Sequence, residues 1–308
     1  MYLKTIIQRN KVYSGNSYVG ILDLNFTRRL QLFLLCALLQ CASSLHSAVI
    51  LVPEDVLQDY KMFVGDAPPA SVTDFGGSYA RRPVVELVLL LQALTEGGYN
   101  KQIILRTTPG YAQTMRTLVA GGAHLSGVTQ WKQELAKFAP RIGSSFALIR
   151  SGEYQLGVFA CKGQPPKPNI VLSSLAVVAD ERSSVEWSAL QWVGFKRLEA
   201  SDNLPTRVRL VCLGRVDAAI AEFPSSATMG ITAAGFSLQA IPNIKLVIEA
   251  SRHYPVSSEA MGSQRVALAL NRGLKLIRRS GVVKRALLQS GFHHPQARQW
   301  KALKLRSD

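Results

Sequence analysis

The polar side chains best placed to do chemistry stand where apolar, strand-like segments end. They carry hydroxyl, carboxylate and guanidinium groups: Asp66, Thr107, Thr108, Thr129, Arg182, Ser183 and Glu222. Hydroxyls together with groups of both charges suit a zwitterionic or hydrogen-bonding molecule, because such a ligand needs a few convergent polar contacts. The sequence therefore predicts a binding site for a small polar solute.

No pattern typical of a catalytic or metal centre occurs in the sequence. CxxC, HExxH, GxSxG and GxxxxGK are missing, and the only adjacent histidines are His293-His294. Two neighbouring histidines without companion ligands make a poor metal site, so we expect no metal and no cofactor. We predict binding without turnover, with an enzyme on the same scaffold as an alternative because fold does not fix function.

Ser183 and Glu186 form a capping-box pattern at the start of a predicted helix over residues 184–193. A helix start presents free N–H groups and a partial positive charge, and beside Arg182 it could hold a carboxylate or phosphate. Ordinary capping without a ligand explains the pattern equally well, so both interpretations stay open.

Strands alternate with helices in the segments that must position these groups. In the first half we expect strands at 60–64, 102–106 and 125–129 and helices at 84–95, 109–120 and 130–138. Alternation of this kind predicts an α/β fold with a mainly parallel sheet covered on both faces by helices.

A proline-dense stretch, residues 162–168, follows an extended apolar segment at 154–161 and predicts a boundary between two lobes. Beyond it we expect strands at 170–178, 217–221 and 265–270 and helices at 184–193, 205–213, 272–279 and 282–290. The sequence thus predicts lobe 1 at 49–155 plus 265–308 and lobe 2 at 156–264. The chain would cross between them near residues 154–160 and 266–270.

A leader is expected before the lobes. Arg28-Arg29 precede an apolar run at residues 30–42, and small residues follow it, which is the order of a secretory signal. The run is shorter than the roughly 20 residues that a membrane-spanning helix needs. We therefore expect residues 1–48 to be a leader with a signal peptide, cleaved between about Ser43 and Val49, and a periplasmic protein. An uncleaved anchor and a buried helix are the alternatives.

The chain is strongly basic, with a formal net charge of +16. The positive electrostatic potential of such a protein favours binding to anionic ligands, membrane surfaces or nucleic acid. The basic C-terminal segment has few aromatic residues that could stack on bases, so we expect a solvated face and no nucleic-acid partner. An oxidising compartment would permit Cys161 and Cys212 to pair, but their apolar surroundings favour two buried free thiols.

The order and spacing of these segments resemble the family 3 extracellular solute-binding proteins, which have the two-lobed type II periplasmic-binding-protein fold. Gly127-Val128-Thr129 is similar to the first-lobe turn that holds the ligand carboxylate in that family. The segment from Leu213 to Glu222, LGRVDAAIAE, is similar to the second-lobe segment whose last acidic residue contacts the ligand amino group. The C-terminal residues 266–281 resemble the return strand and last helix.

The resemblance implies a set of ligand-binding residues: Asp66, Gly127, Thr129, Arg182, Ser183, Ser184 and Glu222. It also exposes a departure, because amino-acid binders of the family carry an arginine at the position of Glu134. A bidentate clamp on an α-carboxylate is missing there, so we expect a ligand other than a standard amino acid held in the usual way.

The function implied is that of a monomeric binding protein that closes, by hinge motion, on a small polar or anionic solute. It would deliver the solute to a membrane partner, an ABC transporter or a sensor. A cytoplasmic effector-type regulatory domain is the alternative from another class, but no helix-turn-helix pattern precedes the first lobe.

Overall fold

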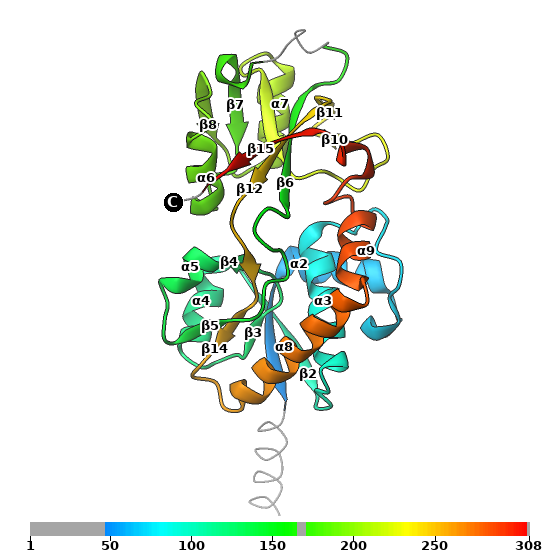
Figure 1. Cartoon of the computed structure of the whole chain (residues 1–308), viewed down its shortest axis with the longest axis vertical. Coiled ribbons are helices and arrows are strands. Elements are labelled where there is room, and N and C mark those ends of the chain that lie inside the picture. Colours follow the sequence, from blue (N-terminus) through cyan, green and yellow to red (C-terminus); the bar gives the residue numbers. More distant parts are fainter. Residues whose placement is uncertain (1–46, 165–170, 307–308) are drawn as a thin grey trace, which may run out of the picture. The chain divides into compact units, whose positions relative to one another are not determined.

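The computed structural model describes residues 47–164 and 171–306. They belong to one compact unit, Ser47–Asp308, which is built around two sheets (Figure 1). The predicted signal segment, residues 28–42, lies outside the described residues. No helix in the described ranges is long and apolar enough to cross a membrane.

The first sheet has the strand order β2-β1-β3-β14-β5. Its strands are β1 (Ala48–Pro53), β2 (Ile103–Thr108), β3 (Leu125–Ser126), β5 (Ile142–Ser144) and β14 (Pro255–Ser257). β1 pairs in parallel with both β2 and β3, and its apolar side chains are buried, as expected for a central strand of a covered parallel sheet. We call this sheet and the helices around it lobe 1.

The strand predicted at residues 60–64 is wrong, because these residues end a helix, α2 (Glu54–Val64). Val56, Leu57 and Tyr60 are its buried residues, at the i, i+1 and i+4 positions of one helical face. The first strand is β1 instead, which starts 12 residues before the predicted start. A short apolar run alone does not distinguish a strand from a turn of buried helix.

The second sheet contains eight strands and, with its helices, forms lobe 2. Six follow the order β10-β11-β6-β9-β7-β8, and β12 joins β6 to β15. The bounds are β6 (Tyr154–Cys161), β7 (Ala176–Ala179), β8 (Arg197–Ala200), β9 (Ala218–Ala221), β10 (Gly230–Ala233), β11 (Phe236–Ala240), β12 (Ile244–Ile248) and β15 (Lys301–Leu305). β7 is parallel to β8 and β9, but β6 pairs antiparallel with β9, β11 and β12, so this sheet is mixed and not mainly parallel as predicted.

The helices lie against these sheets (Figure 1). Besides α2, they are α3 (Arg82–Glu96), α4 (Tyr111–Val119), α5 (Lys132–Ala136), α6 (Ser184–Gln191), α7 (Leu204–Cys212), α8 (Ser263–Arg279) and α9 (Val282–Gln289). α3 and α8 pack backbone to backbone, since a Cβ on Gly273 would lie 1.7 Å from the Ala93 oxygen. Single turns of 3-10 helix occur at Pro69–Ser71, Leu172–Ser174 and Pro295–Ala297, and a small pair joins β4 (Gln130–Trp131) to β13 (Arg252–His253).

The predicted lobe boundaries need two corrections. The expected strand at residues 265–270 lies inside α8, where Val266, Leu270 and Leu274 repeat at helical spacing, so no crossing occurs there. The chain instead passes to the second sheet between β5 and β6 and returns between β12 and β13. It then reaches lobe 2 again after α9, because β15 pairs with β12.

The proline-dense stretch is not a lobe boundary either. Residues 165–168 of this stretch lie outside the described part. The strand before it, β6, and the strand after it, β7, belong to the same sheet. Local composition marks a break in secondary structure and does not say whether the next element joins a new sheet.

Cys161 and Cys212 form a disulfide, which corrects the expectation of two free thiols. It joins the end of β6 to the end of α7, and the two Cα atoms are 5.0 Å apart across a separation of 51 residues. Only the packing of α7 on the sheet brings the two side chains together, so the sequence left the pairing undecided.

Candidate functional site

A cavity of about 960 Å³ lies between residues of the two lobes. Lobe 1 contributes the first turn of α2 directly after β1, the loop after β2, the start of α3 and the β3–β4 connection. Lobe 2 contributes the loop from β7 to α6, part of α7 and the residues after β9. Most of these segments follow the carboxyl ends of parallel strands, where ligands of α/β proteins gather because the loops diverge there.

The structure places four of the seven predicted site residues at this cavity: Thr129, Arg182, Ser183 and Glu222. Gly127 and Ser184 are not among the lining residues, and neither is Asp66, which is exposed in the turn that follows α2. Asp66 was expected at the cavity because the first strand was predicted at residues 60–64, directly before it. Since β1 ends at Pro53, the acidic residue that lines the cavity after the first strand is Asp55, in the first turn of α2.

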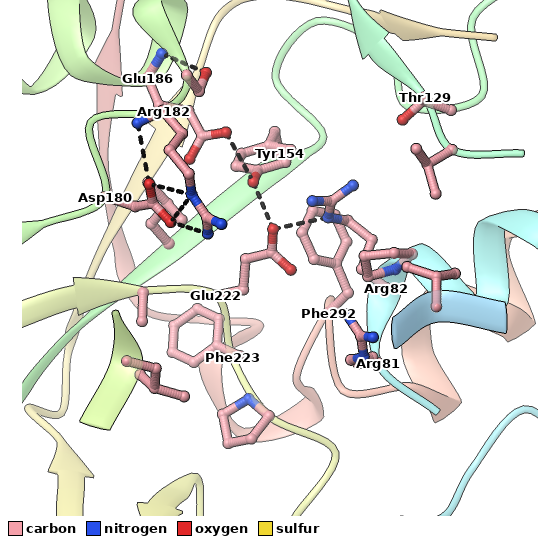
Figure 2. Close-up of a pocket in the computed structure, with 18 of the residues that line it drawn as sticks. Arg81, Arg82, Thr129, Tyr154, Asp180, Arg182, Glu186, Glu222, Phe223 and Phe292 are labelled. Atoms are coloured by element: carbon pink, nitrogen blue, oxygen red, sulfur yellow. Dashed lines mark hydrogen bonds and ion pairs between the residues drawn. The ribbon is translucent and has the colours of Figure 1, made fainter. Parts of the chain in front are cut away.

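Arg82, which the sequence analysis missed, joins the two lobes. It stands in the first turn of α3, and its Nη1 donates to Glu86 Oε1 at 2.7 Å. Its Nε donates to Glu222 Oε1, also at 2.7 Å (Figure 2). Burial opposes the charge on Arg82, but Glu222 and Glu86 outweigh it and hold the pKa of Arg82 well above its usual value. Its partner Glu86 is completely buried.

Tyr154, at the start of β6, connects two carboxyl groups of lobe 2. Its hydroxyl lies 2.5 Å from Glu222 Oε1 and 3.1 Å from Glu186 Oε1. A phenol has one proton to donate, so a proton on Glu186 satisfies both contacts at once. Burial raises the pKa of Glu186. Burial also acts on Glu222, but Arg82 and Tyr154 lower the pKa of that carboxyl instead. The pKa values of two glutamates in one network, whose side chains are 16% and 29% exposed, are thus shifted in opposite directions.

Arg252, on β13, is the second arginine that the sequence analysis missed. Its Nε donates to Thr129 Oγ1 at 3.1 Å and its Nη2 donates to the Thr129 carbonyl oxygen at 2.6 Å. The guanidinium lies 4.8 Å from the centre of the Trp131 ring and 3.7 Å from Glu186 Oε1. Thr129 completes the network, because its N–H and hydroxyl donate to Glu86 at 2.9 and 2.7 Å.

We call this closed set of contacts the paired network: Arg82, Glu86, Thr129, Tyr154, Glu186, Glu222 and Arg252. A sequence signal for the two arginines existed. Arg82 directly precedes the proline that opens an apolar helix, and Arg252 interrupts the apolar run around β12 to β14. A charge in such a run must have buried partners, although the sequence does not name them.

Two further hydrogen bonds link the lobes beside this network. Trp131 Nε1 donates to Ser183 Oγ at 2.8 Å, and Ser184 Oγ donates to Glu134 Oε1 at 3.1 Å. Ser183 also accepts from the Glu186 N–H at 3.2 Å, which confirms Ser183 as the helix cap. The Glu186 side chain turns to Tyr154 instead of back to the cap, so only half of the predicted capping box forms.

A second charged group, the Asp180 corner, lies on the lobe 2 side of the cavity and consists of Asp180, Arg182 and Arg207. Arg182 donates to Asp180 Oδ1 from Nε at 2.9 Å and to Oδ2 from Nη2 at 2.5 Å. Burial opposes the charge of Asp180, but Arg182 lowers the pKa of this carboxyl below its usual value. In Figure 2, Arg82 and the Asp180–Arg182 pair approach from opposite sides of Glu222.

Arg207, on α7, has fewer partners. Its side chain is 10% exposed and its Nη2 is 3.8 Å from Asp180 Oδ2, beyond hydrogen-bonding distance. Its Nε is buried and has no hydrogen-bond partner within the described ranges. Burial lowers the pKa of Arg207 from its usual value.

Nothing in residues 47–164 and 171–306 groups three or more histidine, cysteine or acidic side chains in a way that could hold a metal ion. The chemistry available at the cavity is therefore that of arginines, carboxyl groups and hydroxyls, which can orient a polar molecule.

No protein-family description matches the sequence, and no curated protein matches it significantly. Solved structures do match. The VFT2 domain of Bordetella pertussis BvgS, as a double mutant, is 13% identical with a TM-score of 0.52, over 80% of this chain and 94% of that one. An amino acid ABC transporter substrate-binding protein from Streptococcus pneumoniae, bound to L-arginine, is 12% identical with a TM-score of 0.50, over 82% and 96%. At such low identity the likeness concerns the fold, and it confirms that this chain has the two-lobed fold of periplasmic solute-binding proteins.

Proposed function

We propose that this protein is an exported solute-binding protein that takes a small polar ligand into the cavity between its lobes, for transport or sensing. One observation carries the proposal: charged and hydroxyl groups of both lobes line one cavity and are already hydrogen-bonded across it. A ligand that adds contacts to both lobes at once would favour the closed arrangement.

The connections between the lobes support closure by a hinge. The chain passes between the sheets three times, before β6, between β12 and β13, and after α9. Few residues need to change their backbone angles for one lobe to move relative to the other. The cavity volume, about 960 Å³, lies at the upper end of the usual range for small-molecule sites.

The ligand would not be a standard amino acid held in the family's usual way. Thr129 and Glu222, which the resemblance assigns to the carboxylate and amino group of such a ligand, are occupied by Arg252 and Arg82. Glu134, at the position of the missing clamp, accepts from Ser184. An amino acid in that pose would have to displace two buried arginines.

The disulfide supports export, because structural disulfides form mainly in oxidising compartments such as the periplasm. Together with the predicted leader it supports a location outside the cytoplasm. A membrane transporter or sensor would then be the partner, and the protein itself would act as a monomer without catalysing a reaction.

A thermal-shift screen of the purified mature protein tests the proposal. Amino acids, short peptides, sugars, organic acids and inorganic anions are compared at constant ionic strength. A ligand present at 100 times its Kd stabilises the native state by about 2.7 kcal/mol, so a true ligand raises the melting temperature clearly. Asp66→Asn, outside the cavity, should retain the shift. If no class of solute stabilises the protein, the proposal is wrong.

A further inference from the structure

The Asp180 corner holds more positive than negative charge. Asp180 accepts three hydrogen bonds from Arg182, from its backbone N–H, Nε and Nη2. The same carboxylate is the nearest acidic group to Arg207, at 3.8 Å. Two guanidinium groups therefore share one carboxylate within the Asp180 corner.

More distant acidic groups also act on the corner. Asp202 and Asp55 act on Arg182, and Asp55 is bonded to Arg81. Glu222 and Glu186 also act on Arg207, but Glu222 is bonded to Arg82 and Tyr154. Glu186 lies against Tyr154 and Arg252. Arg182 adds to the positive potential at Arg207. The lowered pKa of Arg207 agrees with this, since burial is not matched by an adequate counter-charge.

The geometry of Arg207 shows which group could supply the missing acceptor. The buried Nε lacks a partner and Nη2 is too far from Asp180 for a hydrogen bond, so two donors on one edge of a planar guanidinium lack an acceptor. A carboxylate accepts two parallel N–H donors from such an edge in a short bidentate pair. A monoanionic group would also give the corner one carboxylate for each guanidinium.

We infer that this corner binds a carboxylate group of a small organic acid, held by the Nε and Nη2 of Arg207. The inference rests on the proposed function and names its ligand class. Two features nearby support it: Arg182 lies at the same carboxylate, and the loop containing Asp180 leads into the start of α6, whose partial positive charge favours an anion. The contact comes from lobe 2, whereas the position of the family's clamp, Glu134, is in lobe 1.

A purely structural role would not leave Arg207 in this state. Leaving a buried charged donor unsatisfied costs stability. Arg209, two residues along the same helix, is exposed and could carry charge on α7 without that cost. It therefore provides a matched control of the same type on the same helix.

Calorimetry on the whole mature protein tests the inference, with succinate, citrate, lactate and acetate as probes and succinamide and inorganic phosphate for comparison. We expect at least one carboxylate to bind, its amide not to bind, and phosphate to bind more weakly. Arg207→Met should weaken carboxylate binding about 10- to 100-fold, as for loss of hydrogen bonds to a charged group, while Arg209→Met leaves it unchanged.

Two results would overturn the inference. Equal carboxylate affinity in the Arg207→Met and Arg209→Met variants would show that the anion binds elsewhere. Binding of only uncharged or cationic solutes in the screen would refute the ligand class and leave the proposed function standing. If no solute of any class bound, the proposed function itself would fail. A folded Arg207→Met protein, checked by its melting curve, excludes unfolding as the cause of lost binding.

Discussion

The paired network and the Asp180 corner lie on the same cavity and use the same kinds of side chain, yet they are balanced differently. In the paired network Arg82 and Arg252 each meet acceptors on two residues, and three carboxyl groups share a tyrosine and a threonine. In the Asp180 corner two arginines compete for one carboxylate. A buried charge that already has partners fixes the structure, whereas a buried charge without them leaves room for a ligand.

This difference gives the paired network a structural role that the family resemblance did not imply. Arg82 connects Glu86 of lobe 1 to Glu222 of lobe 2, so it links the lobes through residues of the chain itself. Ligand binding in the corner would then add to a closure that is already partly stabilised.

Breaking the paired network should have the largest effect on the stability of the protein. Arg82→Met leaves the buried Glu86 and the partly exposed Glu222 without their cation, and we expect a loss of about 3–5 kcal/mol in the free energy of unfolding, as for other broken buried pairs. Urea denaturation monitored by fluorescence measures it. The adjacent Arg81→Met is the control, since Arg81 is 40% exposed and bonded to Asp55 and Asp59 at the surface, where a pair contributes about 0–1 kcal/mol. Equal losses in both variants would contradict the distinction.

Removing the disulfide should have the next largest effect on stability. It connects β6, which begins with Tyr154 of the paired network, to α7, which carries Arg207. For a loop of 51 residues the chain-entropy estimate is about 4 kcal/mol, and native disulfides commonly contribute 2–5 kcal/mol. The double variant Cys161→Ser/Cys212→Ser should melt at a lower temperature. Dithiothreitol should lower the melting temperature of wild type and leave that of the double variant unchanged.

The two glutamates around Tyr154 should respond to pH in opposite ways. Glu186 has a raised pKa, so its stabilising proton is fully present below the unfolded pKa and is lost as pH rises through the folded value. Glu222 has a lowered pKa, so its contribution exists above the unfolded pKa and is lost as pH falls through the folded value.

Two amide variants, compared from pH 4 to 8, measure this difference. Glu186→Gln imitates the protonated carboxyl, and it should remove part of the stability loss between acidic and neutral pH. Glu222→Gln should cost about 1–3 kcal/mol at neutral pH, because it leaves the Arg82 charge with one anion fewer. Parallel pH profiles for the two variants would show that the protons are not distributed as we describe.

The smallest effect on stability is expected in the corner. Arg207→Met removes a buried charge whose partners are incomplete and replaces it with an apolar side chain, so the free energy of unfolding should stay within about 1 kcal/mol of wild type or increase. Thermal and urea unfolding of the ligand-free protein test this. A loss as large as that of Arg82→Met would mean that Arg207 is part of the structural network and not a place for a ligand.

Part of the site could be predicted because it depends on local patterns. Ser183 lies at a helix start with Glu186 three residues later, and the cap forms where the pattern placed it. Thr129, Arg182 and Glu222 follow apolar segments. Parallel pairing of β7 with β9 brings Arg182 and Glu222 to the same edge of one sheet, and Thr129 reaches the cavity from the end of β3 in the other sheet. The prediction for Asp66 was wrong because the strand expected before it, at residues 60–64, is part of the helix α2.

The sequence by itself determined the alternation of strands and helices, the α/β class and the positions of most helices, because apolar periodicity is set by neighbours a few residues apart. The tertiary structure alone decided which charges meet. Arg82 and Glu222 are 140 residues apart, and Arg252 and Thr129 are 123 apart. No local pattern encodes such pairs, since they depend on where two sheets and their loops place each chain segment. The same packing leaves Arg207 buried with one edge of its guanidinium unpaired.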